Sequence, residues 1–519
     1  MLPARFATSA VTARTSQWLM PDLAMLAAAV TLFYSLFFFG GYQAFFHDSD
    51  AGWHIRAGQQ ILQSGMLPRT DPFSFTAAAK PWFAWEWLAD ITVGTIYQFA
   101  GLAGVALFYA SALATTVWLW FQLNWAAGGN FLLAALFAAP MLSTTNLHWL
   151  ARPHVLGWLF LLATVRFAIH PRFNPGALIG VALLSALWTN IHASFLMGPV
   201  TLLIYAVGAV LSSLVFDTDR QTDWRRARVL SIAAAVALAA SFLNPYGFNL
   251  HRHIFAYLTD TALLDRVGEF QSFNFHLSGS TQILLTLGIA AAGAILSLSR
   301  KDVGSFLQIA FLLALALRSA RGLPLVALIA LPLANGAITQ ALRGATGLLG
   351  SFRKRLDAAL NYGDRLRAID LRLNGILWAP ALLLLAAFAL RLPAVAAHTG
   401  FPASEFPVAA SAEIAKLPPS ARLLAPDKFG GYLIFRFAGT RPVFFDGRSD
   451  LYGAQFLADY GTMTQLRPGW QAILNRYNFT HALLPPNAPL LAALESAGWT
   501  RTYSDPVATL LSRNGASRI

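Results

Sequence analysis

The sequence has no cysteine and little charge. Its 519 residues include 24 acidic and 37 basic side chains, so only 12% are charged, while 56% are hydrophobic. The absence of cysteine excludes disulfides, thiolate nucleophiles and cysteine-ligated metals. The composition excludes an ordinary soluble globular protein. The start of the chain does not show the pattern of a signal peptide, which is a short basic region, an apolar region and an A-x-A cleavage site. We therefore expect an uncleaved N-terminus.

Long apolar runs are what the sequence has instead. Such runs recur over the first 400 positions, and a backbone in lipid must satisfy its own hydrogen bonds, so we expect helices. We predict an α-helical polytopic membrane protein with about eleven transmembrane helices. The predicted spans are 23–45, 101–123, 129–146, 153–169, 176–191, 194–216, 228–243, 281–299, 304–318, 322–342 and 374–397. The segment 86–99 is too short for a comfortable span, and we predict an interfacial helix there.

Basic residues favour one orientation of these helices. If 86–99 does not cross, arginine and lysine gather in alternate connections, above all in the segment 343–373. Arg5 and Arg14 precede the first predicted span. The positive-inside rule then places the N-terminus and 343–373 in the cytoplasm. The same rule explains the net charge of +13, so we expect no nucleic acid partner.

Polar side chains gather in the connections that this orientation places outside. The first outer loop, 46–100, and a second outer loop, 244–280, hold several of them. The set comprises Asp48, Asp50, His54, Arg56, Arg152, His154, Asn190, His192, Glu269, Arg318 and Arg321. Charged residues at membrane depth cost about 2.5 to 3.5 kcal/mol and are tolerated where they face a polar cavity. We therefore expect one outward-facing polar cavity.

Asp48 and Asp50 form a D-x-D pair after the first predicted span. Such a pair suits a shared divalent cation such as Mg²⁺ or Mn²⁺, or the acceptance of a proton from a nucleophilic hydroxyl. A solvated loop that ends a helix explains the same spacing, because D-x-D is common. His54 follows Asp50 at i+4 on a short predicted helix. Arg56 suits phosphate binding or, equally, snorkelling to lipid headgroups.

The remaining candidates lie at helix junctions. Arg152 precedes a proline and a helix start with His154 beside it, so it suits either a phosphate site or a helix cap. Asn190 and His192 suit a hydroxyl-rich ligand, although a polar turn is the favoured interpretation.

Two further candidates lie in outer connections. Glu269 lies in the second outer loop, which is long enough for a lid or a second interfacial helix. Arg318 and Arg321 break the positive-inside rule, which favours an anionic ligand such as a diphosphate.

The composition changes near position 400. Short β-branched or aromatic runs at 422–424, 432–437, 442–445, 482–484 and 508–511 alternate with helical patterns at 454–460, 470–477 and 489–497. We predict a membrane domain over 1–399 and a small α/β domain over 400–519, which parity places outside. The motif from Asp446 to Asp450 is interpreted as a turn, with contact to an acceptor sugar as the minor alternative.

These motifs together resemble the GT-C superfamily of membrane glycosyltransferases, which use polyprenyl-phosphate-linked sugars. The resemblance rests on D-x-D-x-G-W-H-I-R-x-G at 48–58, G-x-x-P-R-T-D-P-F-S-F-T at 65–76, P-W-x-x-x-E-W-L at 81–88, and shorter motifs at 152, 190, 244, 269 and 318. It implies an acidic base or metal ligand at Asp48 or Asp50, and two juxtamembrane helices at 51–65 and 86–99. The superfamily's second acidic motif has no carboxylate here, where His148, Arg152 and His154 stand, which leaves metal dependence open.

The resemblance implies an inverting glycosyltransferase of a bacterial cytoplasmic (inner) membrane. The donor would be a polyprenyl-(di)phosphate-linked sugar and the acceptor an extracytoplasmic glycan, lipid or protein. Asp48, Asp50 and Glu269 would act in catalysis, and the other polar residues would bind substrate. An O-antigen-type polymerase or ligase is the alternative. A flippase is less favoured because the sequence has no inverted repeat.

Overall fold

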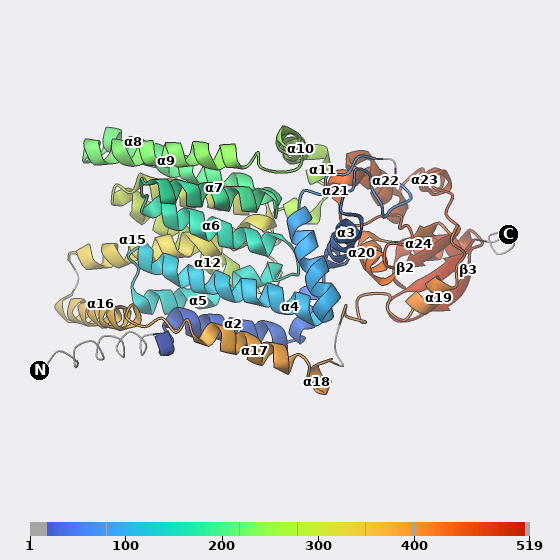
Figure 1. Ribbon diagram of the computed structural model, residues 1–519, viewed down its shortest axis with the longest axis horizontal. Helices are drawn as coiled ribbons and strands as arrows, with labels where there is room; N and C mark the ends of the chain where they lie inside the picture. The colour runs from blue at the N-terminus through green and yellow to red at the C-terminus, as the bar shows by residue number, and fades with distance from the viewer. Residues whose placement is uncertain are drawn as a thin grey trace, which may run out of the picture.

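The computed structural model describes residues 18–78, 80–216, 218–277, 279–347, 349–396 and 400–513. A bundle of apolar helices forms its larger part, and a small sheet with short helices lies at one end of the bundle (Figure 1). The predicted cytoplasmic arginines Arg5 and Arg14 lie outside the described residues.

The helices of the bundle follow the apolar runs. Among the described residues, five helices are long and apolar enough to cross a membrane, and five further apolar helices have 10–17 residues. The bundle helices are α2 (Leu23–Phe37), α4 (Trp87–Ala126), α5 (Phe131–Thr145), α6 (His154–Ile169), α7 (Pro175–Thr189), α8 (Met197–Val215), α9 (Arg220–Ala240), α12 (Ser280–Ser299), α13 (Val303–Arg318), α15 (Leu331–Gly344) and α17 (Trp378–Ala389). The prediction of a polytopic helical membrane protein is confirmed, and the count of eleven spans stays a prediction.

The helix α4 is broken near its first third. Gly101 has φ 60° and ψ −161°, a backbone conformation that no helix contains. The part before it, 87–100, runs across the end of the bundle, while the part after it lies along the other helices (Figure 1). This break agrees with the prediction of a separate helix at 86–99 before the span at 101–123.

The first span is shorter than predicted. We expected it to continue to residue 45, but α2 ends at Phe37. Phe39, Gly40 and Gly41 have φ values of 47°, 96° and 58°, which turn the chain away before a 3₁₀ helix over Gly41–Phe46. The two glycines adopt this left-handed backbone without the steric penalty of a β-carbon.

The C-terminal part contains a four-stranded sheet in the order β1-β2-β4-β3. Its strands are β1 (Leu423–Leu424), β2 (His481–Leu484), β3 (Thr500–Ser504) and β4 (Thr509–Ser512). β1 and β2 are parallel, and the other two pairs are antiparallel. Short helices accompany the sheet: α19 (Ser411–Ala415), α20 (Asp427–Arg436), α21 (Ser449–Tyr452), α22 (Ala454–Thr464), α23 (Trp470–Arg476) and α24 (Pro489–Ser496). The predicted small α/β unit is present, although the boundary at 399/400 adjoins residues outside the described ranges and stays a prediction.

Two predicted strands are wrong. The aromatic run at 432–437 lies largely in the helix α20, and 442–445 contributes only a single bridge, between Val443 and Ser74. Tertiary packing overrides the β propensity of these residues. A β-carbon on Gly52 of α3 (Asp50–Ser64) would collide with the carbonyl oxygen of Gly431 in α20, so the pair of glycines lets the two helices cross at backbone contact.

The bundle has two unlike ends. The helices α3, α10 (Phe248–Thr259) and the C-terminal sheet lie at one end, which we call the site end, and the basic helix α16 (Gly350–Asp370) lies at the other, which we call the basic end (Figure 1). The two predicted outer loops and the predicted cytoplasmic segment 343–373 are therefore separated by the length of the bundle.

Candidate functional site

Arg152 lies at the centre of a cluster of carboxylates at the site end. Its Nη1 is 2.7 Å from Asp48 Oδ2 and 2.8 Å from Glu269 Oε1, and its Nη2 is 2.8 Å from Asp50 Oδ2. Glu269 also receives a hydrogen bond of 2.6 Å from Arg321 Nε. We call these five residues the Arg152 cluster. It brings together three predicted catalytic acids and two predicted phosphate-binding arginines.

Local structure fixes the first two acids. Asp50 is the first residue of α3, and its backbone N–H donates to Asp48 Oδ1 at 2.9 Å. One oxygen of Asp48 therefore accepts from the first N–H of α3, while the other faces Arg152. On the other side, a β-carbon on Gly447 would collide with the Asp50 carboxylate. The C-terminal turn that follows Asp446 thus packs directly on this acid.

The other three members come from later connections. Arg152 precedes α6, and the neighbouring Ala151 N–H donates to the carbonyl of Phe45, near the first loop. Glu269 lies in a short 3₁₀ turn over Gly268–Phe270, and its carbonyl accepts a hydrogen bond of 2.9 Å from Ser319 Oγ. Arg321 follows Ser319 by two residues, with its guanidinium 4.3 Å from the centre of the Phe270 ring.

Burial and charge give these acids different pKa values. Burial raises the pKa of Asp50 to about 7, although Arg152 opposes this shift. Burial also disfavours ionised Glu269, but Arg152 and Arg321 outweigh it and hold the pKa of Glu269 below its ordinary value. Glu269 is therefore a permanent anion at neutral pH. Asp50 has the pKa that suits a group that takes up and releases a proton.

A second acidic group adjoins the cluster, and the sequence analysis did not assign it. His54 Nδ1 is 2.6 Å from Asp90 Oδ1, and Glu86 lies between two histidines, 3.6 Å from His54 Nε2 and 3.6 Å from His192 Nε2. Burial raises the pKa of Glu86 to about 8, so this carboxyl keeps its proton at neutral pH. The sequence did carry a signal for these two acids. Glu86 and Asp90 stand in an otherwise apolar segment, where an ionised carboxylate is costly to bury.

The two remaining predicted histidines lie nearby. His154 Nε2 is 2.9 Å from the carbonyl oxygen of His148, and its ring centre is 6.4 Å from that of His192. His192 Nδ1 is 2.7 Å from Ser194 Oγ. Burial lowers the pKa of His192 to about 3, so its imidazole is neutral beside the arginines.

Three predicted ligand-binding residues belong neither to the Arg152 cluster nor to the histidines beside it. Arg56 donates from Nε and Nη2 to the carbonyl of Phe435, at 3.0 and 2.8 Å, and thereby holds α20 against α3. Asn190 accepts a hydrogen bond from Trp87 and donates to two carbonyls, which matches the favoured turn interpretation. Arg318 ends α13 with an exposed side chain.

A separate ion cluster joins the first outer loop to the C-terminal part. Arg448 Nη2 is 2.8 Å from Asp71 Oδ1 and 2.7 Å from Asp446 Oδ2, and all three side chains are buried. The Tyr452 hydroxyl donates to Asp446 at 2.8 Å. We call these four residues the Arg448 cluster. It gives the motif after Asp446 a structural role, which agrees with the favoured turn interpretation.

The donor set at Asp48 and Asp50 does not fit a divalent cation. Among the described residues, no group of three histidine, aspartate or glutamate side chains is placed to hold a metal ion. The Asp48 and Asp50 oxygens that face the cluster already contact the Arg152 guanidinium. A divalent ion on the same oxygens would lie against a permanent positive charge. The position of Arg152 therefore disfavours the prediction that Asp48 and Asp50 share a divalent cation.

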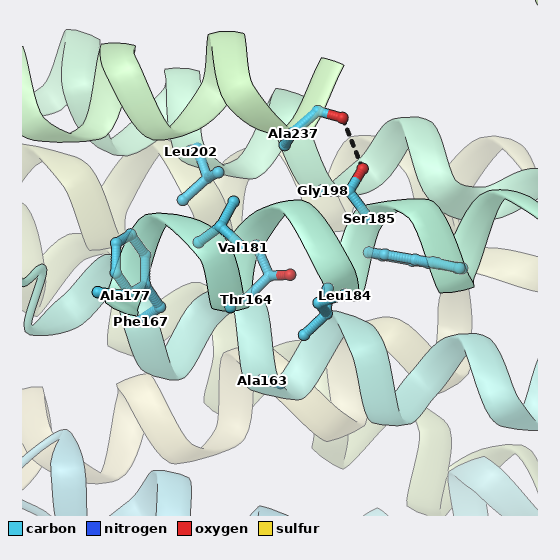
Figure 2. A pocket seen from close by; sticks show the side chains of 12 residues that line it. Ala163, Thr164, Phe167, Ala177, Val181, Leu184, Ser185, Gly198, Leu202 and Ala237 are labelled. Carbon is cyan, nitrogen blue, oxygen red and sulfur yellow. Dashed lines mark hydrogen bonds between the residues drawn. The ribbon is translucent and has the colours of Figure 1, made fainter. Parts of the chain in front are cut away.

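An apolar pocket of about 280 Å³ lies within the bundle. Figure 2 shows residues of four helices around it, including Phe167 of α6, Val181 of α7, Leu202 of α8 and Ala237 of α9. Trp188 at one side of the pocket donates to Ser194 Oγ at 3.0 Å, and Ser194 contacts His192. One residue that lines the pocket is thus linked by hydrogen bonds to His192 at the site end.

Comparisons with known proteins identify the fold. No protein-family profile and no curated protein matches the sequence. The structure of an oligosaccharyltransferase from Archaeoglobus fulgidus, tethered to an acceptor peptide, is similar with a TM-score of 0.50 and 9% identity, over 89% of this chain and 68% of that chain. ArnT from Cupriavidus metallidurans, bound to undecaprenyl phosphate, gives a TM-score of 0.48 and 15% identity, over 96% and 98% of the two chains. The match to the archaeal enzyme shows that this chain has the GT-C fold.

Proposed function

We propose that this protein is an integral membrane glycosyltransferase that transfers a sugar from a polyprenyl-(di)phosphate-linked donor to an extracytoplasmic glycan, lipid or protein. The observation that carries the proposal is the Arg152 cluster. Its acids come from two loops more than a hundred residues apart and meet two arginines at one end of a GT-C fold. That combination supplies a proton acceptor beside a site for an anionic leaving group.

The reaction assigns different roles to the members of the cluster. A carboxylate oxygen of Asp50 or Asp48 accepts the proton of an acceptor hydroxyl. The hydroxyl oxygen attacks the anomeric carbon, the bond from that carbon to the donor phosphate oxygen breaks, and the configuration inverts. Arg321 stabilises the negative charge that develops on the departing phosphate, and the exposed Arg318 contributes little. Glu269 holds Arg152 and Arg321 in place.

The apolar pocket supports a place for the donor's hydrocarbon tail. It lies between α6, α7, α8 and α9, and its lining residue Trp188 is linked through Ser194 to His192, so a tail seated there would have its headgroup near the site end. Replacement of Val181 by tryptophan would fill this space. We expect that variant to raise the KM for the lipid-linked donor more than it lowers kcat.

The proposed compartment is the outer face of a bacterial cytoplasmic membrane. We take 1–399 as the catalytic membrane domain, with its N-terminus in the cytoplasm, and 400–519 as the extracytoplasmic domain. Because the chain has no cysteine, single cysteines at the exposed positions Gln465 and Lys354 report on each end. An impermeant maleimide applied to whole cells should label Gln465→Cys and spare Lys354→Cys, and the reverse pattern would remove the proposal.

The decisive experiment is transfer from a lipid-linked donor by the purified protein. Asp48→Asn and Asp50→Asn are assayed singly and together, and we expect the double variant to be inactive. Asp364→Asn is the matched control, because Asp364 pairs with Arg343 at the basic end. This variant should retain full activity. Wild-type transfer by the double variant is incompatible with the proposed mechanism. Product length then separates the addition of one sugar from the transfer of a whole glycan.

A further inference from the structure

The Arg152 guanidinium occupies the position where three carboxylates would otherwise share a cation. Both of its terminal nitrogens lie within 2.8 Å of carboxylate oxygens from Asp48, Asp50 and Glu269. The Arg152 side chain is 17% exposed. Acids from two separate loops meet here, and their mutual repulsion requires a positive charge between them.

The negative charge of convergent carboxylates is usually neutralised in one of two ways, by a divalent metal ion or by a guanidinium. Hard divalent ions take oxygen ligands at about 2.0 to 2.6 Å and neutralise several acids at once. A guanidinium does the same through its fork of five N–H donors, and it cannot be deprotonated in a protein. The two solutions compete for the same oxygens, because an ion bound to them would repel the guanidinium.

The charges around the cluster also favour the guanidinium alone. Within the cluster, Arg152 and Arg321 face three carboxylates, so these five side chains carry at most one net negative charge. The adjoining Glu86 and His192 add little charge, since the first keeps its proton at neutral pH and the second is neutral. Little net charge remains to attract a divalent ion.

We propose that Arg152 takes the place of a divalent cation in this protein. The wild-type cluster binds no such ion, and the guanidinium both holds the three acids together and presents a fixed positive charge to the substrate. The second role rests on the proposed function. The first role does not, since it concerns only the acids and the ion.

The test is a titration of the purified full-length protein with Mn²⁺ in detergent, followed by electron paramagnetic resonance. Wild type and Arg152→Lys should bind no more Mn²⁺ than Asp50→Asn does. Arg152→Met removes the charge and keeps most of the side-chain length, and it should gain about one bound Mn²⁺ per chain. The double variant Arg152→Met with Asp50→Asn should lose that ion again, which assigns it to the cluster.

Two results would overturn the proposal. One is Mn²⁺ bound to the wild type and released by Asp50→Asn, which decides the matter even if Arg152→Met does not fold. The other is a folded Arg152→Met protein that binds no Mn²⁺. Transfer by the wild type should also resist EDTA. An absence of transfer under every condition would count against the proposed function and leave the binding result intact.

Discussion

The Arg152 cluster and the Arg448 cluster use the same chemistry in different surroundings. Each places one guanidinium between carboxylates, and each takes at least one acid from the first outer loop. Arg448 is 2% exposed and its two acids are fully buried, whereas Asp48 and Glu269 are 22% and 33% exposed. The Arg152 cluster is therefore open to a ligand at Asp48 and Glu269, with Asp50 buried behind them at 6% exposed, whereas the Arg448 cluster is closed.

The partners of the acids explain this difference. Asp71 accepts hydrogen bonds from the backbone N–H groups of Phe73 and Ser74, at 3.0 and 2.9 Å, and Asp446 accepts from Tyr452. The Arg448 guanidinium lies 4.7 Å from the centre of the Trp82 ring. Its carboxylates have no capacity left for a substrate. An arginine among acids is therefore informative about function only when the acids remain accessible.

The largest effect is expected where the closed cluster is broken. Arg448→Met would leave Asp71 and Asp446 buried without a cation, and should lower the free energy of unfolding by about 3 to 5 kcal/mol. Denaturant titration in detergent, followed by tryptophan fluorescence, measures this loss. Unchanged stability would show that the Arg448 cluster does not hold the first loop to the C-terminal part.

Glu86 tests burial of an acid without a close cation. Its pKa is about 8 in the folded protein and about 4.5 when unfolded, so the folded state keeps a proton that the unfolded state loses. Wild-type stability relative to Glu86→Gln should be highest below pH 4.5 and fall by about 1.4 kcal/mol per pH unit up to pH 8. Thermal unfolding of both proteins across pH 5 to 9 measures the difference.

Glu269 supplies the matched control for that experiment. Its pKa is lowered, so its contribution to stability is lost only as the pH falls below the ordinary range of a glutamate. The stability difference between wild type and Glu269→Gln should therefore stay constant over pH 5 to 9. A slope of the same sign in both variants would contradict the assignment of a retained proton to Glu86.

Arg152→Lys should separate function from folding. An ammonium keeps the charge but cannot contact three carboxylates through a planar fork, so the acids shift. A displacement of about 1 Å typically costs about 100-fold in rate. We therefore expect Arg152→Lys to lower the rate of transfer about 100-fold and to change the stability little. Arg448→Lys is the comparison, because its main effect should be a loss of stability rather than a direct loss of transfer. If the two lysine variants behave alike, the distinction between open and closed clusters fails.

The smallest effects distinguish two neighbouring arginines. Arg321 contacts Glu269 and the Phe270 ring, whereas Arg318 is exposed at the end of α13. Arg321→Ala should reduce transfer by about tenfold, equal to about 1.4 kcal/mol. Arg318→Ala should change it by less than about twofold, as is usual for an exposed charge. Equal losses would place the leaving phosphate between them.

Sequence patterns predicted the helices well and the contacts of single residues poorly. Each predicted span contains a helix, because every residue of a long apolar run must satisfy its backbone hydrogen bonds within the segment. The same patterns left Arg56 and Asn190 open between ligand binding and a structural role, and in the structure both donate to backbone carbonyls. The segment 432–437 was predicted as a strand because its aromatic residues have β propensity. Propensity is a local property and contains no information about the contact between Gly431 of α20 and Gly52 of α3.

The sequence by itself determined that this chain is a bundle of membrane helices with its polar residues gathered in alternate connections. That follows because insertion into lipid depends on composition and charge, which are local properties. Only the tertiary structure decided that Arg152 meets Asp48, Asp50 and Glu269, and that Arg448 closes a second cluster. Those contacts join residues as many as 117 positions apart in the Arg152 cluster, and their pairing depends on how the loops pack over the end of the bundle.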